Sequence, residues 1–113
     1  MSDAYSSSRI DDLPTLWDGM CKLVRAGLGV TAFGVNVLDI GPDYVTTDHT
    51  ESASGQEELY LVLEGEGQMW RNGDSFAVRQ GDLVRNPPGG EHGLHNTGEV
   101  PIRLFVFELR VAH

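Results

Sequence analysis

The amino-acid sequence predicts an all-β protein, either a sandwich or a barrel, that folds as a single domain of 113 residues. Its 14 glycines and 5 prolines divide the chain at short intervals. The segments between them are rich in β-branched, aromatic and leucine residues. The dipeptide Asn72-Gly73 stands between two such segments and is typical of a tight β-hairpin turn. We expect residues 1–9 to be a disordered tail and residues 10–113 to form the domain, beginning with a short irregular segment.

The expected elements follow the glycine and proline signals along the chain. Pro14 suits the first turn of a helix, so a helical turn is expected over residues 11–17. Short strands at spacings of about 8–12 residues, as in a sandwich or barrel, follow it. In chain order, the expected strands cover residues 20–26, 30–39, 44–49, 57–63, 67–72, 74–79, 82–86, 91–96 and 102–111.

Two of the expected strands are apolar on both faces. Side chains alternate between the faces of a strand, yet residues 59–63 and 104–107 are apolar throughout. A single barrel covers only one face of such a strand. We therefore expect the N-terminal segment or a second copy of the chain to cover the other face, and we favour a homodimer.

The charge balance excludes several classes of partner. Only 8 Lys and Arg face 17 Asp and Glu, for a formal net charge of −9, whereas nucleic acids and anionic membranes require cationic side chains. No apolar signal segment opens the chain, and the longest apolar runs are too short to span a bilayer. Cys21 is the only cysteine, and we expect it to be a small buried hydrophobe. These features favour a cytoplasmic protein that binds neither nucleic acid nor membranes.

The most specific motif of the sequence ends at Asn96. Gly81 is followed after five residues by Pro87, and Gly89, His92 and Asn96 then follow at intervals of one, two and three residues. This pattern resembles the second conserved motif of the cupin superfamily.

A second segment carries the same resemblance. Glu58 and Gly65 are separated by six residues, as at the end of the first cupin motif, and Asn72-Gly73 lies between the two motifs, where cupins place a hairpin. The resemblance covers roughly residues 30–110. It implies a small single-domain cupin, of the cupin type-2 conserved-barrel kind, with a jelly-roll β-barrel.

The resemblance also implies a metal site inside the barrel. Cupins bind a divalent metal through two His and one Glu of the first motif and one His of the second. Glu58 and His92 match two of these positions, and His49 is the only upstream histidine. Glu51 stands where the other first-motif His belongs, and the spacing from His49 to Glu58 is longer by two or three residues. The expected metal ligands are therefore His49, Glu51, Glu58 and His92.

Several metals suit the expected ligands, and two further residues are expected to line a pocket beside them. Two His and one carboxylate suit Fe(II), a second carboxylate favours Mn(II), and zinc is compatible as well; nickel completes the candidates. Tyr60 and Asn96 share the barrel interior with the ligands by strand parity, so they are expected to line a substrate pocket.

The expected function is binding of, or action on, an unidentified small organic molecule. A metal-dependent oxygenase, isomerase or decarboxylase is the first hypothesis. The alternatives are a metal-free ligand-binding or regulatory protein, and a metal-independent isomerase or cyclase with His92 as general base. Arginines on the expected strands are candidates to bind a substrate carboxylate. We favour the interpretation that they form ion pairs with Asp and Glu on the surface. They are Arg71, Arg79, Arg85 and Arg103.

Overall fold

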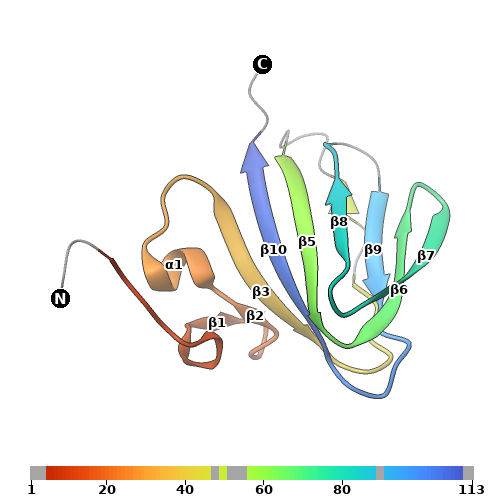
Figure 1. The fold of residues 1–113 in the computed structure, drawn as a ribbon, viewed down its shortest axis with the longest axis horizontal. Coiled ribbons are helices and arrows are strands. Elements are labelled where there is room, and N and C mark those ends of the chain that lie inside the picture. Colours follow the sequence, from red (N-terminus) through yellow and green to blue (C-terminus); the bar gives the residue numbers. More distant parts are fainter. Residues whose placement is uncertain (1–4, 47–48, 51–55, 89–90, 111–113) are drawn as a thin grey trace.

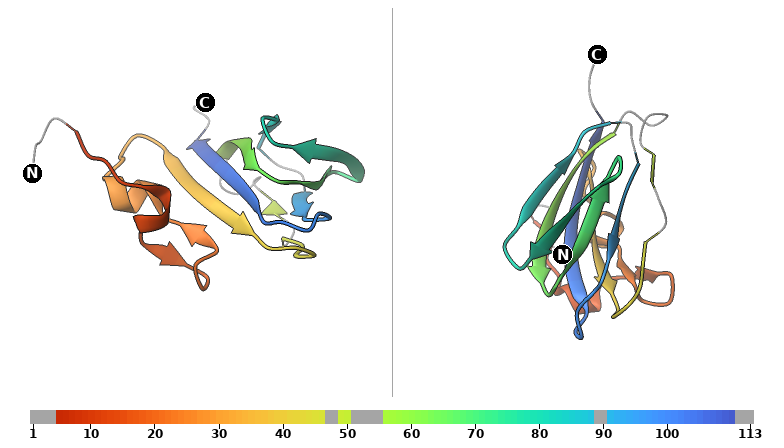
Figure 2. Two further views of the ribbon diagram at one scale, coloured as in Figure 1. Left: turned by 60° about the horizontal axis from the view of Figure 1, so that its bottom comes forward. Right: turned by 90° about the vertical axis from the view of Figure 1, so that its right-hand side faces the viewer.

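The computed structural model describes residues 5–46, 49–50, 56–88 and 91–110, and only the backbone of residues 49, 50, 91 and 110. It confirms the predicted all-β class and shows two antiparallel sheets facing each other, as in a jelly roll (Figures 1 and 2). One sheet has the strand order β1-β2-β3-β10-β5-β8 and the other has the order β4-β9-β6-β7. No helix within the described residues is long and apolar enough to cross a membrane.

The strands have the following bounds. In the first sheet they are β1 Thr15–Leu16, β2 Cys21–Lys22, β3 Gly34–Ile40, β5 Gln56–Glu64, β8 Leu83–Asn86 and β10 Ile102–Arg110. In the second sheet they are β4 His49–Thr50, β6 Glu66–Arg71, β7 Asp74–Arg79 and β9 Glu91–His95.

The core lies between the two sheets. Alternation of side chains along each strand places one set inward, and the inward residues of both sheets form one buried cluster. Its members are Ile40, Tyr60, Val62, Met69, Val78, Leu94, Ile102, Leu104 and Val106.

The structure contains turns at Asn72-Gly73 and at Gly65, the two glycine positions beside the predicted motifs. Asn72 and Gly73 both have positive φ, 50° and 88°, and join β6 to β7, so the predicted hairpin is confirmed. Gly65 has a φ of 88°, and a Cβ there would lie 2.7 Å from the carbonyl oxygen of Pro101. Glycine is therefore required where the first motif ends.

The N-terminal segment differs from the prediction. The expected strand over residues 20–26 is wrong, because only β2 is extended there and helix α1 (Val24–Leu28) follows. The expected helical turn over residues 11–17 is also wrong: a 3₁₀ turn, η1 (Ile10–Asp12), is followed by β1. Tertiary pairing decides both cases, since β1 pairs with β2, and β2 continues the sheet at the edge of β3.

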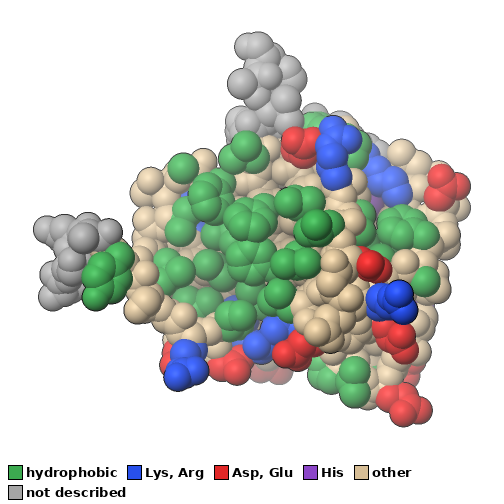
Figure 3. Space-filling view, in the orientation of Figure 1, with side chains coloured by type: hydrophobic (Ala, Val, Ile, Leu, Met, Phe, Trp, Pro, Cys, Tyr) green, Lys and Arg blue, Asp and Glu red, His purple; other side chains and the backbone are tan. Residues whose placement is uncertain are grey.

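The N-terminal segment covers part of the outer face of the first sheet. Leu13 and Val24 pack on Val35 and Val37 of β3 and bury them. The cover reaches Phe105 of β10. Farther across the face, Phe107 of β10, Leu59 of β5 and Leu83 of β8 remain 37%, 41% and 65% exposed. Figure 3 shows the apolar surface that results over this face. The prediction of strands that are apolar on both faces is confirmed.

Candidate metal and ligand site

Strand register brings the polar side chains of the interior into one row. Glu108 of β10 lies directly opposite Glu58 of β5, and Glu58 in turn lies opposite Asn86 of β8. The next inward row contains Val106, Tyr60 and Val84. Residues opposite one another in an antiparallel pair share a face of the sheet. The acidic row therefore lies on the inner face, beside Tyr60.

Three buried groups from the two sheets meet at one point. The Nε2 atom of His92 on β9 lies 2.9 Å from the Oε1 atom of Glu58. The hydroxyl of Tyr60 donates to the same Oε1 at 3.0 Å and lies 3.0 Å from Nε2 of His92. Glu58 is 5% exposed and His92 is fully buried. Because the first sheet supplies Glu58 and Tyr60 and the second supplies His92, closing the barrel creates this site.

Arg71 reaches the other side of the His92 ring. Its Nη1 atom lies 3.4 Å from Nδ1 of His92, and its Nη2 donates to the carbonyl of Pro87 at 3.1 Å. A guanidinium only donates, so this contact suits an imidazole that accepts at Nδ1 and carries its proton on Nε2, facing Glu58. The expectation that Arg71 pairs with a surface carboxylate missed this contact.

Two other arginines pair as expected. Arg85 pairs with Glu57 on the outer face. Arg103 of β10 forms a bidentate pair with Asp39 of β3, with nitrogen–oxygen distances of 2.8 and 2.9 Å. Neither of these guanidinium groups faces the barrel interior, because both belong to outward positions of the strand register.

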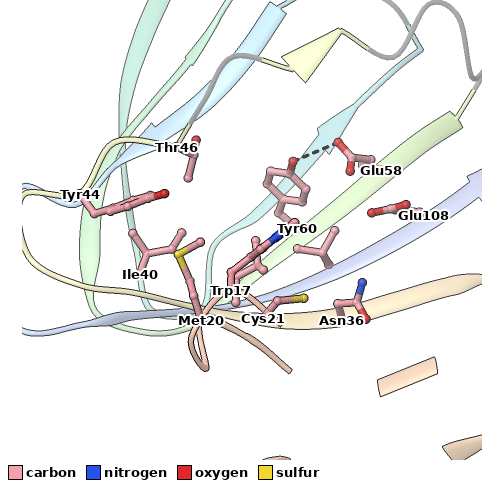
Figure 4. Close-up of a pocket in the computed structure, with 12 residues that line it drawn as sticks. Trp17, Met20, Cys21, Asn36, Ile40, Tyr44, Thr46, Glu58, Tyr60 and Glu108 are labelled. Atoms are coloured by element: carbon pink, nitrogen blue, oxygen red, sulfur yellow. Dashed lines mark hydrogen bonds between the residues drawn. The ribbon is translucent and has the colours of Figure 1, made fainter. Parts of the chain in front are cut away.

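A cavity of about 430 Å³ opens beside the buried groups (Figure 4). Its wall combines the N-terminal hairpin with the inner faces of β3, β5 and β10 and the segment before β4. Cavities of this size hold small organic ligands. The lining residues are Trp17, Met20, Cys21, Asn36, Leu38, Ile40, Tyr44, Thr46, Glu58, Tyr60, Val106 and Glu108.

Sequence reasoning anticipated only part of this wall. Glu58 and Tyr60, which strand parity placed in the barrel interior, line the cavity. Glu108 was missed, although strand alternation from Val106 places it on the inner face. Trp17 was also missed, because nothing in the local sequence signals that its hairpin would join the sheet edge.

Cys21 is a buried side chain of the cavity wall, and its predicted burial is confirmed. Burial raises the pKa of its thiol above the usual value, and the negative charge of Glu108 raises it further. A raised pKa leaves the thiol protonated at neutral pH. Cys21 is therefore expected to act as a small hydrophobic side chain in this wall.

The remaining predicted site residues are placed as follows. His49 occupies the position of β4 directly opposite His92 of β9, and its side chain lies outside the described residues, as does all of Glu51. Asn96 is fully buried, and its Nδ2 donates to the carbonyls of Ile40 and Val100. These bonds hold the connection between β9 and β10, and Asn96 does not line the cavity among the described residues.

Glu58 and His92 have the spacing that two ligands of one divalent metal ion require. Two ligands bound at about 2.1 Å and at a right angle lie about 3.0 Å apart, close to the 2.9 Å between Glu58 Oε1 and His92 Nε2. No group of three His, Cys, Asp or Glu side chains occurs within the described part of the chain. The two atoms thus have the spacing of two positions of a metal site, which needs Nε2 of His92 to give up the proton that faces Glu58. His49 stands in register with His92.

A buried carboxylate and imidazole inside a double-sheet barrel define a cupin-type site. Residues 37–108 match the family described as Cupin domain, and the chain belongs to this family. A solved cupin protein from Bacteroides fragilis has the same fold, with a TM-score of 0.79 and 18% identity over 99% of this chain and 88% of that one.

Curated relatives are similar over shorter stretches. An uncharacterized protein from Methanocaldococcus jannaschii is 40% identical over 42% of this chain and 38% of its own length. An oxalate-binding protein from Thermotoga maritima is 32% identical over 44% of this chain and 41% of its own length. The matched regions thus span less than half of each of these relatives.

Proposed function

We propose that this cupin binds a small organic ligand in the barrel cavity and holds a divalent metal ion, Fe, Mn, Zn or Ni, beside it. The observation that carries the proposal is the buried Glu58–His92 contact of 2.9 Å beside a cavity of about 430 Å³. The name of the Thermotoga maritima relative, an oxalate-binding protein, supports ligand binding in general.

The chain's own residues have separate roles in this proposal. Glu58 and His92 would hold the ion, with His49 as the third ligand and Glu51 as the fourth, and the chemistry the ion would supply is Lewis acidity toward an oxygen atom of the ligand. Tyr60 orients the ligand through its hydroxyl, which already contacts both Glu58 and His92. Apolar side chains of the cavity wall, such as Ile40 and Val106, would pack against the ligand. An oxygenase, isomerase or decarboxylase reaction is compatible with this arrangement.

Elemental analysis of the purified protein tests the metal. We expect about one divalent ion per chain in protein from metal-replete cells, and its loss in Glu58→Gln and His92→Gln. Glu57→Gln and His95→Ala are matched controls, because each changes a neighbour on the same strand and leaves the metal content unchanged. Circular dichroism establishes that each variant is folded. Folded wild-type protein without bound metal would contradict the metal site.

A metal-free ligand-binding protein is the second candidate. It is favoured by the way in which Glu58, Tyr60 and His92 satisfy one another's hydrogen bonds without an ion. In that case a chelator leaves ligand binding and the melting temperature unchanged. A chelator-induced fall of several degrees in melting temperature would exclude this candidate.

We also propose that the chain forms a homodimer through the outer face of the first sheet. Phe107, Leu59 and Leu83 form an exposed apolar surface there, beyond the cover of the N-terminal segment. The Arg85–Glu57 pair lies at its border and offers both signs of charge. A two-fold axis through this surface would set it against its own copy.

A further inference from the structure

Asn86 carries a buried hydrogen-bond donor to which no role has yet been assigned. Its side chain is 2% exposed, and its Nδ2 atom has no hydrogen-bond partner within the described part of the chain. A buried donor without a partner is costly, because nothing replaces the water that it leaves on folding. Most buried polar side chains avoid this cost. The exception at Asn86 therefore points to a partner that is acquired in another state of the protein.

Strand pairing places this donor beside the carboxylate of Glu58. Asn86 of β8 lies directly opposite Glu58 of β5, and opposed residues of an antiparallel pair share a face, with Cβ atoms about 5 Å apart. Val84, two residues before Asn86 on the same strand, packs against the core between the sheets. Alternation along β8 therefore directs the carboxamide of Asn86 to the inner face, where Glu58 also lies.

The carboxylate of Glu58 is held at one of its two oxygens. Nε2 of His92 lies 2.9 Å from Oε1, and the hydroxyl of Tyr60 donates to the same atom at 3.0 Å (Figure 4). Among the described residues, no hydrogen bond ends on Oε2. A carboxylate accepts hydrogen bonds at both oxygens. An oxygen with room for another bond thus lies on the residue opposite Asn86, whose donor lacks one.

We propose that Asn86 is a positioning residue of the metal site, and that its Nδ2 donates to Oε2 of Glu58 when Glu58 holds the ion. This inference rests on the proposed function, because it concerns the same metal site. Carboxylates that bind metals are themselves held by hydrogen bonds from outer residues. In the described structure, the contact with His92 fixes the carboxylate through Oε1. Loss of the Nε2 proton, which metal binding requires, removes that bond and leaves the carboxylate free to turn toward Asn86.

The proposal predicts opposite effects of Asn86→Leu on the metal-free and the metal-bound protein. Leucine has a similar branched shape and removes a buried donor that has no partner, so the metal-free protein should keep or raise its melting temperature. The same substitution removes a bond that holds a metal ligand, so metal affinity should fall about tenfold or more. A residue that only packs in the core would instead lower the melting temperature of the metal-free protein.

Zinc titration and thermal unfolding measure the two effects. The affinity for Zn²⁺ is measured by competition with a chromophoric chelator, and the melting temperature is measured after metal removal. Asn86→Ala removes the same donor without the bulk of leucine and is expected to lower zinc affinity as much. Gln68→Leu is the matched control, because it also replaces an amide by leucine, at an exposed position of β6. It should leave zinc affinity unchanged.

Cobalt provides a spectroscopic measurement of the same effect. The visible absorption of bound Co²⁺ depends on how its ligands are arranged around it, and outer residues set that arrangement. We expect Asn86→Leu to shift the cobalt bands, because Glu58 is no longer held at Oε2. Gln68→Leu should leave the bands in place.

Two results would overturn the inference and leave the metal site standing. The first is a zinc affinity and a cobalt spectrum that are the same in Asn86→Leu as in the wild-type protein. The second is a fall in the melting temperature of metal-free Asn86→Leu, including failure to fold, which would indicate a packing role. A wild-type protein that binds neither Zn²⁺ nor Co²⁺ would contradict the metal site and the inference together.

Discussion

The pKa of the Cys21 thiol can be measured from the pH dependence of its alkylation rate. Its pKa is raised by burial and then by the charge of Glu108, so the thiolate forms only at higher pH than in a free thiol. We expect the rate of alkylation by iodoacetamide to have its midpoint above the ordinary thiol pKa of about 8.5. The pH profile of the single-cysteine protein gives this midpoint directly.

Glu108→Gln supplies the comparison for that profile. Removing a nearby negative charge favours the thiolate, so the midpoint should move toward lower pH while the effect of burial remains. Urea-unfolded protein should return to the ordinary value. A midpoint at or below the ordinary value in the folded protein would contradict the raised pKa.

At the level of single residues, the sequence placed Glu58, Tyr60 and His92 in the barrel interior. It did not indicate that Glu108 and Trp17 line the same cavity. Glu58 and His92 stand at motif positions with defined spacing, and parity added Tyr60. Glu108 followed the same alternation but carried no motif. Trp17 was not predictable, because its contact with the cavity depends on a hairpin that is placed by pairing with the edge of β3.

The N-terminal segment is attached to the barrel by an ion-pair cluster as well as by packing. Arg103 on β10 binds Asp39 on β3 with two hydrogen bonds, and one of its nitrogens also binds Asp11 of η1 at 2.6 Å. The Asp39 pair is half-buried, while Asp11 is exposed. The bond to Arg103 lowers the pKa of Asp11 below its usual value. The two aspartates are therefore expected to differ in their contribution to stability.

Substitution of the two aspartates tests this difference. Asp39→Asn removes a bidentate pair and is expected to lower the free energy of unfolding by about 1 kcal/mol. Asp11→Asn should cost less, because solvent screens its pair. Since the pKa of Asp11 is lowered on folding, its contribution is present at neutral pH and is lost as the pH falls below about 4.

Urea unfolding at neutral and acidic pH measures both effects. Asp43→Asn is a control, because Asp43 is an exposed aspartate of a turn. An Asp11→Asn variant that loses as much stability as Asp39→Asn would contradict the expected ranking.

At the level of elements, most strands of the barrel were predictable because glycine and proline mark their ends. The strand expected over residues 44–49 is an exception, because residues 44–46 contribute only an isolated bridge at Val45 and β4 covers His49–Thr50. The expected strand over residues 74–79 matches β7, and that over 91–96 differs from β9 by one residue. The N-terminal segment was not predictable in this way. Short strands such as β1 and β2 have no periodicity of their own, and pairing with β3 supplies their structure.

For the molecule as a whole, the apolar outer face makes the oligomeric state testable. If this face joins two copies, Leu59→Glu and Leu83→Glu should each place charges in the interface and shift the mass from twice that of the chain to that of one chain. Sedimentation equilibrium measures this mass. Both residues are already partly exposed, so the variants are expected to remain folded.

Val100→Glu is the control for the oligomeric state. Val100 is an exposed apolar residue of the connection between β9 and β10, away from the sheet face. It should leave the mass unchanged. A wild-type protein that sediments as a single chain would contradict the homodimer.

The family match begins at residue 37, whereas Trp17, Met20, Cys21 and Asn36 of the cavity wall all precede it. The part of the chain that matches the cupin family is thus separate from these four residues of the cavity wall. On the proposal that the cavity binds a ligand, substitutions in the β1–β2 hairpin are expected to alter which ligands are accepted while the Glu58–His92 pair is kept. Exchange of this hairpin between related cupins would test that expectation.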